Sequence, residues 1–525
     1  MPKTVFTDVY NNKKMLEGVH RWCEAVGSTL GPRGLNVAIN KGWECLVIHD
    51  GLNIGRSIAF SDPQKDLGVR IVREASQKQV QLVGDGSTAV AVLVDSILTQ
   101  AERMISTGIN AMSLRNEIES GLSILQRELT TKGKSISSVK DLTTVATISS
   151  ADPVLGKLVA EVVHKMGDSG VISIEESKSK DTWVDYQEGM QFETGYLSPY
   201  FITDIETMTA AIENPYIWIT DETITNINQC LPFINKITKV TKNLVVIAPD
   251  ITLDPLAAFI ETKVKGGMNI LCIKAPLFNQ HQRNFLQDIA TLTGGRVISP
   301  NAGISYEDCD VDVLGTAELV TSMSAATTII GGGGDKKTVS SHIKGLKTLL
   351  STQSIPYEAE KTKERIAKLT NGVAVIRTGG ETEIEMKERR ERVDDAVGAT
   401  KAALRSGIVP GGEVIYLHIR DVLDQTIPGH RILYKALEQP FRRLVENAGM
   451  DSGKLLERLE TVNGKVDNAG FDVTKDETPI DLISGNIVDP LEVSREALNN
   501  SVSVSIQLLT SGYVIAPEKY PDVVS

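Results

Sequence analysis

The spacing of apolar residues predicts helices at both ends of the chain. Between Lys14 and Leu30 the apolar positions recur at steps of four, three and four, as on one buried helix face. This helix should stop at Leu30-Gly31-Pro32-Arg33-Gly34, because glycine and proline interrupt helices. Residues Leu67 to Leu129 also have a mostly helical pattern, interrupted by Gly84-Asp85-Gly86-Ser87-Thr88. A further helix is predicted from about Glu383 to Leu404.

The middle of the chain has a different pattern. Runs of apolar and aromatic residues, such as Tyr216 to Ile219 and Leu244 to Ile247, predict strands, and helical segments alternate with them. Short strands are also predicted near Val37 and at Val373 to Ile376. Helical ends around an α/β middle predict a multidomain protein in which one domain is inserted into another.

Composition narrows the class of protein. A length of 525 residues fits about three or four domains, and 41% hydrophobic with 23% charged residues is typical of a soluble globular protein. The longest apolar run, Ala89 to Val94, is far shorter than the ~20 residues of a membrane helix. No signal peptide is evident, and five scattered cysteines favour a reducing compartment. A net charge of −12 disfavours a nucleic-acid partner, and seven histidines without a His-Glu-x-x-His motif disfavour a zinc enzyme.

The sequence lacks the common Gly-x4-Gly-Lys-Ser/Thr phosphate loop. The run Gly331 to Gly334 could wrap a phosphate or form a mobile loop. Gly84-Asp85-Gly86-Ser87-Thr88 is a better candidate, because glycines permit close approach and a helix start attracts anions. A carboxylate beside phosphate is repelled unless a cation lies between them, so Asp85 indicates magnesium. The alternative is an ordinary helix cap formed by Asp85 or Ser87.

Two other acidic residues have the same ambiguity. Asp50 follows His49 and precedes Gly51 in a turn, where an ordinary hydrogen-bonded Asx turn would explain it. Asp395 lies about 200° around its predicted helix from the apolar stripe, so a solvated helix face would explain it. Thr29 to Pro32 and Pro410-Gly411-Gly412 offer further places where the backbone could closely approach a ligand.

Several longer sequence motifs follow one another along the chain in a characteristic order. They are Thr29-Leu30-Gly31-Pro32-Arg33-Gly34 with Asn36-Val37, Asp50-Gly51, Gly84-Asp85-Gly86-Ser87-Thr88, Thr147-Ile148-Ser149, Glu188-Gly189-Met190-Gln191-Phe192, Gly195-Tyr196-Leu197-Ser198-Pro199-Tyr200-Phe201, the stretch Leu286 to Gly295, Gly372-Val373-Ala374-Val375-Ile376 and Gly411-Gly412. In this order they resemble the group I chaperonins, the GroEL-like family, across nearly the whole chain. Sequence motifs of this length, in the same order as in the family, are highly specific for it.

The resemblance implies a multidomain fold with a mainly α equatorial ATPase domain, a small α/β intermediate domain and an α/β apical domain inserted in the middle. The expected boundaries are 1–131 and 406–525 for the equatorial domain, 132–187 and 373–405 for the intermediate domain, and 188–372 for the apical domain. Gly189, Gly372 and Gly407 fall near the junctions, where glycine can absorb hinge rotation. The resemblance also implies seven-membered rings closed by a heterologous interface.

The same resemblance implies a site for ATP and Mg²⁺, with K⁺ as a further candidate. Asp50 and Asp395 would position the attacking water, and Asp85 would hold the magnesium ion. The remaining nucleotide contacts that it implies are Thr29, Leu30, Gly31, Pro32, His49, Gly84, Gly86, Ser87, Thr88, Ala89, Gly412, Asp472 and Asp489.

The sequence departs from the family pattern at several of these positions. Ala89 replaces a hydroxyl residue, His49 stands where lysine is usual, and Glu413 replaces a third glycine. Asp472 stands where asparagine is usual in bacterial members. These differences indicate a divergent member of bacterial or viral origin, and we expect it in the cytoplasm of a bacterial cell or of a virus-infected host cell.

The resemblance also implies an apical groove that captures exposed hydrophobic segments of unfolded proteins. Glu261 stands at a groove position that is usually apolar. Burying an unpaired carboxylate would exclude the apolar loop of a lid protein, whereas a location at the rim would leave Glu261 hydrated. On the first alternative we expect weak or absent binding to a standard bacterial co-chaperonin. The client-binding residues that the resemblance implies are Tyr196, Tyr200, Phe201, Leu231, Ile234, Leu256 and Ile260.

Three functions are compatible with these features. The first is an ATPase that folds proteins, in which ATP binding and hydrolysis drive conformational changes of a homo-oligomeric ring. The second is a ring scaffold or passive holdase that kept the fold and lost turnover. The third, a small-molecule kinase, would need a second substrate pocket, which the sequence does not indicate. Asp50, Asp85 and Asp395 favour the first, because a scaffold needs no three carboxylates around phosphate. Unfolded proteins are then the expected partners, without nucleic acid or membrane.

Overall fold

The structure is a computed structural model, which describes residues 4–6, 11–41, 44–168, 170–177, 179–205, 207–299, 306, 309–353, 356–462, 466–475 and 477–517. The chain divides into two compact units. The first unit comprises Met1–Asp168 and Gly380–Ser525, and the second comprises Ser169–Gly379. The second unit therefore interrupts the first along the chain, as the sequence pattern predicts.

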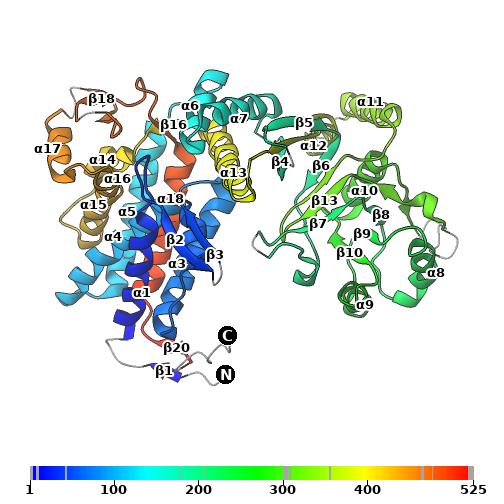
Figure 1. Ribbon diagram of the computed structural model, residues 1–525, viewed down its shortest axis with the longest axis horizontal. Helices are drawn as coiled ribbons and strands as arrows, with labels where there is room; N and C mark the ends of the chain where they lie inside the picture. The colour runs from blue at the N-terminus through cyan, green and yellow to red at the C-terminus, as the bar shows by residue number, and fades with distance from the viewer. Residues whose placement is uncertain are drawn as a thin grey trace. The chain divides into compact units, whose positions relative to one another are not determined.

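The first unit is mainly helical. Its helices are α1 (Asn11–Gly27), α2 (Gly51–Ser57), α3 (Pro63–Val83), α4 (Ser87–Ser106), α5 (Ala111–Lys132), α6 (Val139–Ser150), α7 (Pro153–Met166), α13 (Glu383–Ser406), α14 (Val414–Ile419), α15 (Pro428–Ala436), α16 (Gln439–Asn447), α17 (Ser452–Val462) and α18 (Leu491–Leu509). Helices α1, α3, α4, α5 and α18 lie side by side (Figure 1) around a hydrophobic core that includes Trp22, Leu93 and Leu498. Burial of these apolar faces holds the bundle together.

Four antiparallel strand pairs complete this unit. They are β1 (Thr4–Phe6) with β20 (Val514–Ala516), β2 (Val37–Lys41) with β3 (Glu44–Ile48), β16 (Ile408–Pro410) with β19 (Val488–Pro490), and β17 (Ala469–Phe471) with β18 (Pro479–Asp481). The β1–β20 pair joins the two ends of the described chain (Figure 1). In the β16–β19 pair Val409 is opposite Asp489, so the turn after β16 lies beside that carboxylate.

The second unit is built on three sheets. A sheet with the order β10-β9-β8-β11 has β12 paired to β8, a second has the order β6-β14-β13-β7, and a third has the order β4-β15-β5. The strands are β4 (Val171–Glu176), β5 (Trp183–Gln187), β6 (Gly189–Phe192), β7 (Ala210–Glu213), β8 (Tyr216–Thr220), β9 (Asn243–Ala248), β10 (Asn269–Lys274), β11 (Val297–Ile298), β12 (Gly315–Thr316), β13 (Leu319–Ser322), β14 (Thr327–Ile330) and β15 (Val373–Thr378). Parallel pairing of β8, β9 and β10 confirms the predicted α/β character.

Helices flank these sheets in the second unit (Figure 1). They are α8 (Ile227–Ile237), α9 (Leu253–Val264), α10 (Asn279–Thr293), α11 (Lys336–Thr352) and α12 (Pro356–Asn371). Trp218 of β8 is fully buried and makes edge-to-face contacts with Phe233 of α8 and Phe259 of α9. These aromatic contacts attach both helices to the sheet. Within the described ranges, no helix is long and apolar enough to cross a membrane.

The glycine run after β14 is a packed loop, so the two predictions for it are wrong. The N–H groups of Gly331 and Gly332 donate to the carbonyl of Glu188 at 2.8 and 3.4 Å. The N–H groups of Gly333 and Gly334 donate to backbone carbonyls at 2.9 Å. All four backbone N–H groups are therefore used inside the fold. The run neither forms a phosphate-binding loop nor lies unattached at the surface.

Candidate functional site

The loop between α3 and α4 is shaped by two glycines. Gly84 ends α3 with φ of 77°, and Gly86 precedes α4 with φ of 89°, a left-handed conformation that favours glycine. Gly86 supplies no side-chain cap, and the carboxylate of Asp85 accepts instead from the Gly86 N–H at 2.5 Å. The predicted alternative of a simple Asp85 or Ser87 cap is therefore wrong. The first N–H groups of α4, at Ser87, Thr88 and Ala89, face a loop without such a cap.

A second helix contributes to the environment of Asp85. The hydroxyl of Ser149, at the end of α6, donates to the other carboxylate oxygen of Asp85 at 3.1 Å. Burial raises the pKa of Asp85, its two hydrogen bonds partly offset that increase, and the negative charge of Asp50 adds to it. Asp85 is therefore held in one orientation at a place where its negative charge is costly.

Helix α13 packs directly on this loop and brings Asp395 to it. A Cβ added to Gly398 would lie 2.5 Å from the Cα of Gly84, so only glycine permits this approach. Asp395 is half-buried, and the interpretation of a solvated helix face is wrong. Burial, and then the charges of Asp85, Asp50 and its acidic neighbours on α13, raise the pKa of Asp395 well above its ordinary value. The three predicted carboxylates therefore converge.

Asp50 caps the helix that follows its turn, as the turn predicts, and its charge also acts on α13. Its carboxylate caps α2 by accepting from the N–H groups of Leu52 at 3.2 Å and Asn53 at 2.7 Å. The side chain of Asn53 then donates to Glu391 of α13 at 2.7 Å. Burial, followed by the charge of Asp50, raises the pKa of Glu391 to about 7. Capping thus fixes Asp50 while its charge still acts on the carboxylates of α13.

The turn after α1 lies against the start of α4. Thr29 is buried, and its hydroxyl is 3.5 Å from the hydroxyl of Thr88. A Cβ added to Gly34 would meet the His49 ring at 2.9 Å, so His49 lies beside this turn. Gly31 has φ of 88° and packs on Leu444. Among the other residues implied here, Leu30, Ser87 and Ala89 are buried and Pro32 is exposed.

A second acidic pair lies at the turn after β16. The carboxylate of Asp489 accepts from the N–H groups of Gly412 and Glu413, the latter at 3.5 Å. Burial raises the pKa of Asp489 to about 7, with a contribution from Asp85. Burial, then Asp489 and Asp85, also raise the pKa of Glu413 well above its ordinary value. Both carboxylates are thus in electrostatic contact with the Asp85 loop.

Asp472 is connected to the other site residues only through its own turn. Its carboxylate accepts from the N–H and hydroxyl of Thr474 and pairs with Lys475 at 2.8 Å. Burial alone would raise the pKa of Asp472, but these bonds reverse the effect and lower it. The guanidinium of Arg33 donates to the Thr474 carbonyl at 2.9 Å, which links this turn to the one after α1. Asp472 therefore lies at the edge of the site, already engaged in its own turn.

The donor set fits a divalent cation bound together with an anionic ligand. Within the described ranges no group of three or more His, Cys, Asp or Glu residues forms a preformed cation cage. Mg²⁺ is commonly held by one or two carboxylates, with water and phosphate oxygens completing its shell. Asp85, whose negative charge contributes to the raised pKa of Asp395, is a suitable ligand for such an ion.

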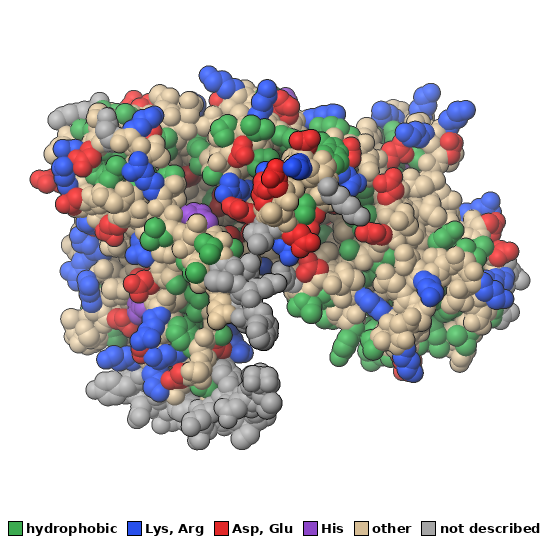
Figure 2. Space-filling view, viewed as in Figure 1, with side chains coloured by type: hydrophobic (Ala, Val, Ile, Leu, Met, Phe, Trp, Pro, Cys, Tyr) green, Lys and Arg blue, Asp and Glu red, His purple; other side chains and the backbone are tan. Residues whose placement is uncertain are grey.

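The predicted client-binding residues all lie in the second unit, around α8 and α9. Tyr200 is 70% exposed and Leu231 of α8 is 42% exposed. Tyr196, Ile234, Leu256 and Ile260 are half-buried against the core. Hydrophobic side chains also gather along the edge of this unit over α9 (Figure 2), where Leu253 and Val264 are exposed.

The structure bears on two predictions for this surface. Phe201 is fully buried, with the Lys263 ammonium 5.7 Å from its ring centroid, so it supports the surface from within. The side chain of Glu261 is 62% exposed and pairs with Lys265 one turn along α9. This ion pair lowers the pKa of Glu261. In the free chain Glu261 is therefore hydrated, as in the second of the two alternatives, and weak binding to a co-chaperonin stays a prediction.

The sequence reasoning missed several polar residues around the site. Ser149 belongs to one of the quoted words, yet its bond to Asp85 depends on how α6 packs. Glu391 precedes Asp395 by one helical turn, a spacing that could have identified it. Asn53 and Gln79 have no sequence signal, because their partners lie far away along the chain.

Comparison with known proteins identifies the family and the fold. The profile of the TCP-1/cpn60 chaperonin family matches residues 23–519. The fold is similar to that of the chaperonin gp146 from the bacteriophage EL 2 (Pseudomonas aeruginosa), crystallised in the presence of ATP-BeFx. One crystal form has a TM-score of 0.67 and 19% sequence identity, covering 97% of this chain and 98% of that one. A second form has a TM-score of 0.62 and 19% identity, covering 98% and 99%.

Proposed function

The chain belongs to the TCP-1/cpn60 chaperonin family, and from that premise we propose that it is an ATP-dependent chaperonin that captures unfolded proteins and is driven by ATP hydrolysis. The observation that carries the proposal is the convergence of Asp50, Asp85 and Asp395 at the start of α4. A protein that only scaffolds a ring would gain nothing from this arrangement, because clustered carboxylates are unfavourable without a ligand.

Different residues of the site would have different roles in phosphoryl transfer. The N–H groups at the start of α4 and the hydroxyls of Thr29 and Thr88 would bind phosphate oxygens. Asp50, fixed by its bonds to α2, and Asp395 of α13 would orient the attacking water and accept its proton. Glycines at 31, 84 and 86 let the backbone reach the ligand.

Asp85 is proposed as the Mg²⁺ ligand. When bound, the ion neutralises phosphate charge and so stabilises the transferring phosphoryl group. The bond from Ser149 and the N–H of Gly86 keep the Asp85 carboxylate oriented toward that position. At the other end, Gly412, Asp472 and Asp489 would surround the ribose and the base.

The surface around α8 and α9 is proposed as the client-binding surface. Exposed Tyr200 and Leu231, flanked by half-buried Ile234, Leu256 and Ile260, could hold extended apolar segments of an unfolded chain. We propose that the second unit carries the apical domain and that copies of the chain assemble into rings. Gly372 and Gly407, with φ of 61° and 85°, would serve as hinges.

Steady-state ATP hydrolysis by the assembled protein, with and without an unfolded client, tests the proposal. We expect Mg²⁺-dependent turnover that changes when the client is added, and rings in negative-stain images whose shape depends on ATP. Client binding without any hydrolysis would identify the alternative, a passive holdase or ring scaffold. Transfer of phosphate to a small molecule would contradict both.

A further inference from the structure

A buried amide lies directly under the Asp85 loop. Gln79 of α3 is 0% exposed, and its Nε2 donates to the carbonyls of Asp85 at 3.0 Å and Val493 at 3.1 Å. Its Oε1 accepts from the Nδ2 of Asn500, on α18, at 2.9 Å. Both amide hydrogens and the carbonyl oxygen of Gln79 are therefore used.

These bonds connect the two ends of the proposed nucleotide site. The Asp85 carbonyl belongs to the residue whose carboxylate faces the proposed Mg²⁺, and Val493 lies in the first turn of α18, soon after Asp489. A Cβ added to Gly86 would lie 2.9 Å from the Nε2 of Gln79, so the loop rests on this amide. Gln79 and Asn500 are 421 positions apart, so only the folded chain brings them together.

We infer that Gln79, oriented by Asn500, is a positioning residue that sets the place of the Asp85 carboxylate for the metal–nucleotide complex. The inference rests on the proposed function, because it assumes that Asp85 serves a nucleotide-bound cation. Gln79 touches neither reacting atoms nor metal and acts only through the loop. Loss of such outer partners typically reduces metal affinity or activity by about 10–100-fold.

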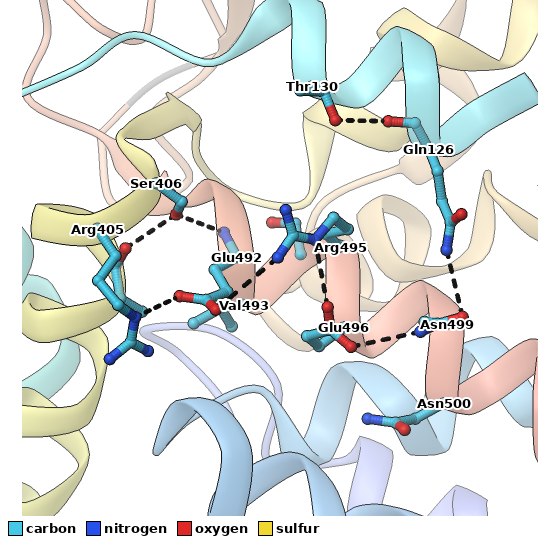
Figure 3. Close-up of polar contacts among 12 residues, drawn as sticks. Gln126, Thr130, Arg405, Ser406, Glu492, Val493, Arg495, Glu496, Asn499 and Asn500 are labelled. Carbon is cyan, nitrogen blue, oxygen red and sulfur yellow. Dashed lines mark hydrogen bonds and ion pairs between the residues drawn. The ribbon is translucent and has the colours of Figure 1, made fainter. Parts of the chain in front are cut away.

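The chain contains a matched control pair one residue away on α18. Asn499 accepts from the Nε2 of Gln126, on α5, at 3.2 Å, an amide–amide bond between a neighbouring helix and α18 (Figure 3). Asn500 projects from a different side of α18 in the same view (Figure 3). Among the described residues, Gln126 bonds to Asn499 and Thr130, which lie outside the Asp85 loop, so Gln126→Met removes a partly buried amide–amide bond without touching the site.

The first experiment measures how binding of a non-hydrolysable ATP analogue to the assembled protein depends on Mg²⁺, by calorimetry. For Gln79→Met we expect the half-saturating Mg²⁺ concentration to rise by about 10–100-fold. For Gln126→Met we expect it to stay close to the wild-type value, although both variants lose side-chain hydrogen bonds and some stability. An unchanged Mg²⁺ requirement in Gln79→Met would overturn the inference.

A double variant separates positioning from stability. Gln79→Met combined with Asn500→Leu replaces both partners by apolar groups, which is often nearly neutral for stability. We expect the unfolding midpoint to recover toward wild type while the Mg²⁺ requirement stays raised, because the Asp85 carbonyl still lacks its donor. Recovery of both would show that Gln79 is only structural. If Gln79→Met fails to fold, Asn500→Ala is the milder variant, with a smaller increase expected.

Amide hydrogen exchange in the nucleotide-free protein tests the anchoring without any ligand. We expect faster exchange across residues 84–88 in Gln79→Met and wild-type exchange there in Gln126→Met. Equal exchange in all three proteins would overturn the inference even if the protein is an ATPase. A wild-type protein that binds no nucleotide with Mg²⁺ would instead overturn the proposed function, and the exchange result would still show whether Gln79 holds the loop.

Discussion

At the scale of single residues, the site is defined by carboxylates that are close together and poorly hydrated. Asp85 and Asp395 repel each other, and Asp489 and Glu413 repeat that arrangement at the turn after β16. Such groups are unfavourable for the folded chain alone and become useful only when a ligand with a cation binds among them.

Asp395→Ala should abolish most hydrolysis and leave binding of ATP nearly unchanged. Removing a group that orients water or accepts its proton costs roughly 10²–10⁴-fold in rate. Single-turnover hydrolysis and equilibrium binding, measured on the same preparation, check both parts. Glu388→Ala, at an exposed position two turns earlier on α13, is the matched control and should keep its turnover. A loss of ATP affinity as large as the loss of rate would contradict the role given to Asp395.

Glu413→Gly should stabilise the nucleotide-free protein. Glu413 has φ of 62°, a left-handed conformation that costs a non-glycine residue roughly 1–2 kcal/mol, and its carboxylate is also close to Asp489. Chemical denaturation followed by fluorescence measures the gain. Glu413→Ala removes the charge and keeps the backbone strain, so it should gain less than glycine. Equal or lower stability of the glycine variant would show that neither cost is present.

Glu391 should make stability depend on pH. Its pKa is about 7 in the folded protein against an ordinary value of 4.5, so the folded state binds the proton more tightly than the unfolded chain. Stability should therefore fall as the pH rises from about 4.5 to about 7. Glu391→Gln keeps an oxygen for Asn53 and should flatten this part of the profile. Unfolding midpoints across that range, for both proteins without nucleotide, decide the matter, and parallel profiles would exclude Glu391 as the cause.

At the scale of elements, the contact between α13 and the Gly84–Gly86 loop decides whether the site is complete. Two glycines, Gly84 and Gly398, meet where any side chain would separate the helix from the loop. The bond between Asn53 and Glu391 attaches the same helix to α2. Helix α13 thereby carries Asp395 to a place that no local sequence pattern specifies.

Gly398→Ala should slow hydrolysis without removing a polar group. The added Cβ would lie 2.5 Å from the Cα of Gly84, so α13 must shift away from the loop. We expect at least about a 10-fold lower turnover, because small displacements of catalytic groups are costly. Gly345→Ala, inside α11 with no atom near its added Cβ, is the control and should stabilise its helix by up to about 1 kcal/mol. Full activity of Gly398→Ala would mean that α13 need not touch the loop.

At the scale of the whole molecule, the two units have separate chemistry. The first unit contains every carboxylate of the proposed nucleotide site, and the second contains the exposed apolar residues around α8 and α9. The proposed cycle would need both, because hydrolysis in one unit would have to alter what the other presents to a client.

Leu231→Glu should prevent capture of unfolded protein, whereas Glu261→Val should leave it almost unchanged. Leu231 is exposed and apolar, so a carboxylate there opposes binding of apolar segments. Glu261 is already hydrated and paired with Lys265, so removing it frees no buried charge. Suppression of client aggregation and surface plasmon resonance, the latter also with a bacterial co-chaperonin, measure these effects. A large increase in co-chaperonin binding for Glu261→Val would restore the interpretation of a buried charge.

The sequence by itself determined the α/β insertion within helical ends, the Asp85 loop and the capping turn at Asp50. These features depend on local rules: helical and strand periodicity, the conformational freedom of glycine, and the short reach of an aspartate side chain. The long motifs shared with chaperonins extended this to the family, and the residues proposed to surround a nucleotide follow from the same resemblance.

Only the tertiary structure decided which distant groups meet. It placed Asp395 beside Asp85 rather than in solvent, buried Phe201, left Glu261 hydrated at the rim, and joined Gln79 to Asn500. Each outcome depends on how helices far apart in the chain pack, because burial and charge environment are properties of the assembled neighbours and not of the local sequence.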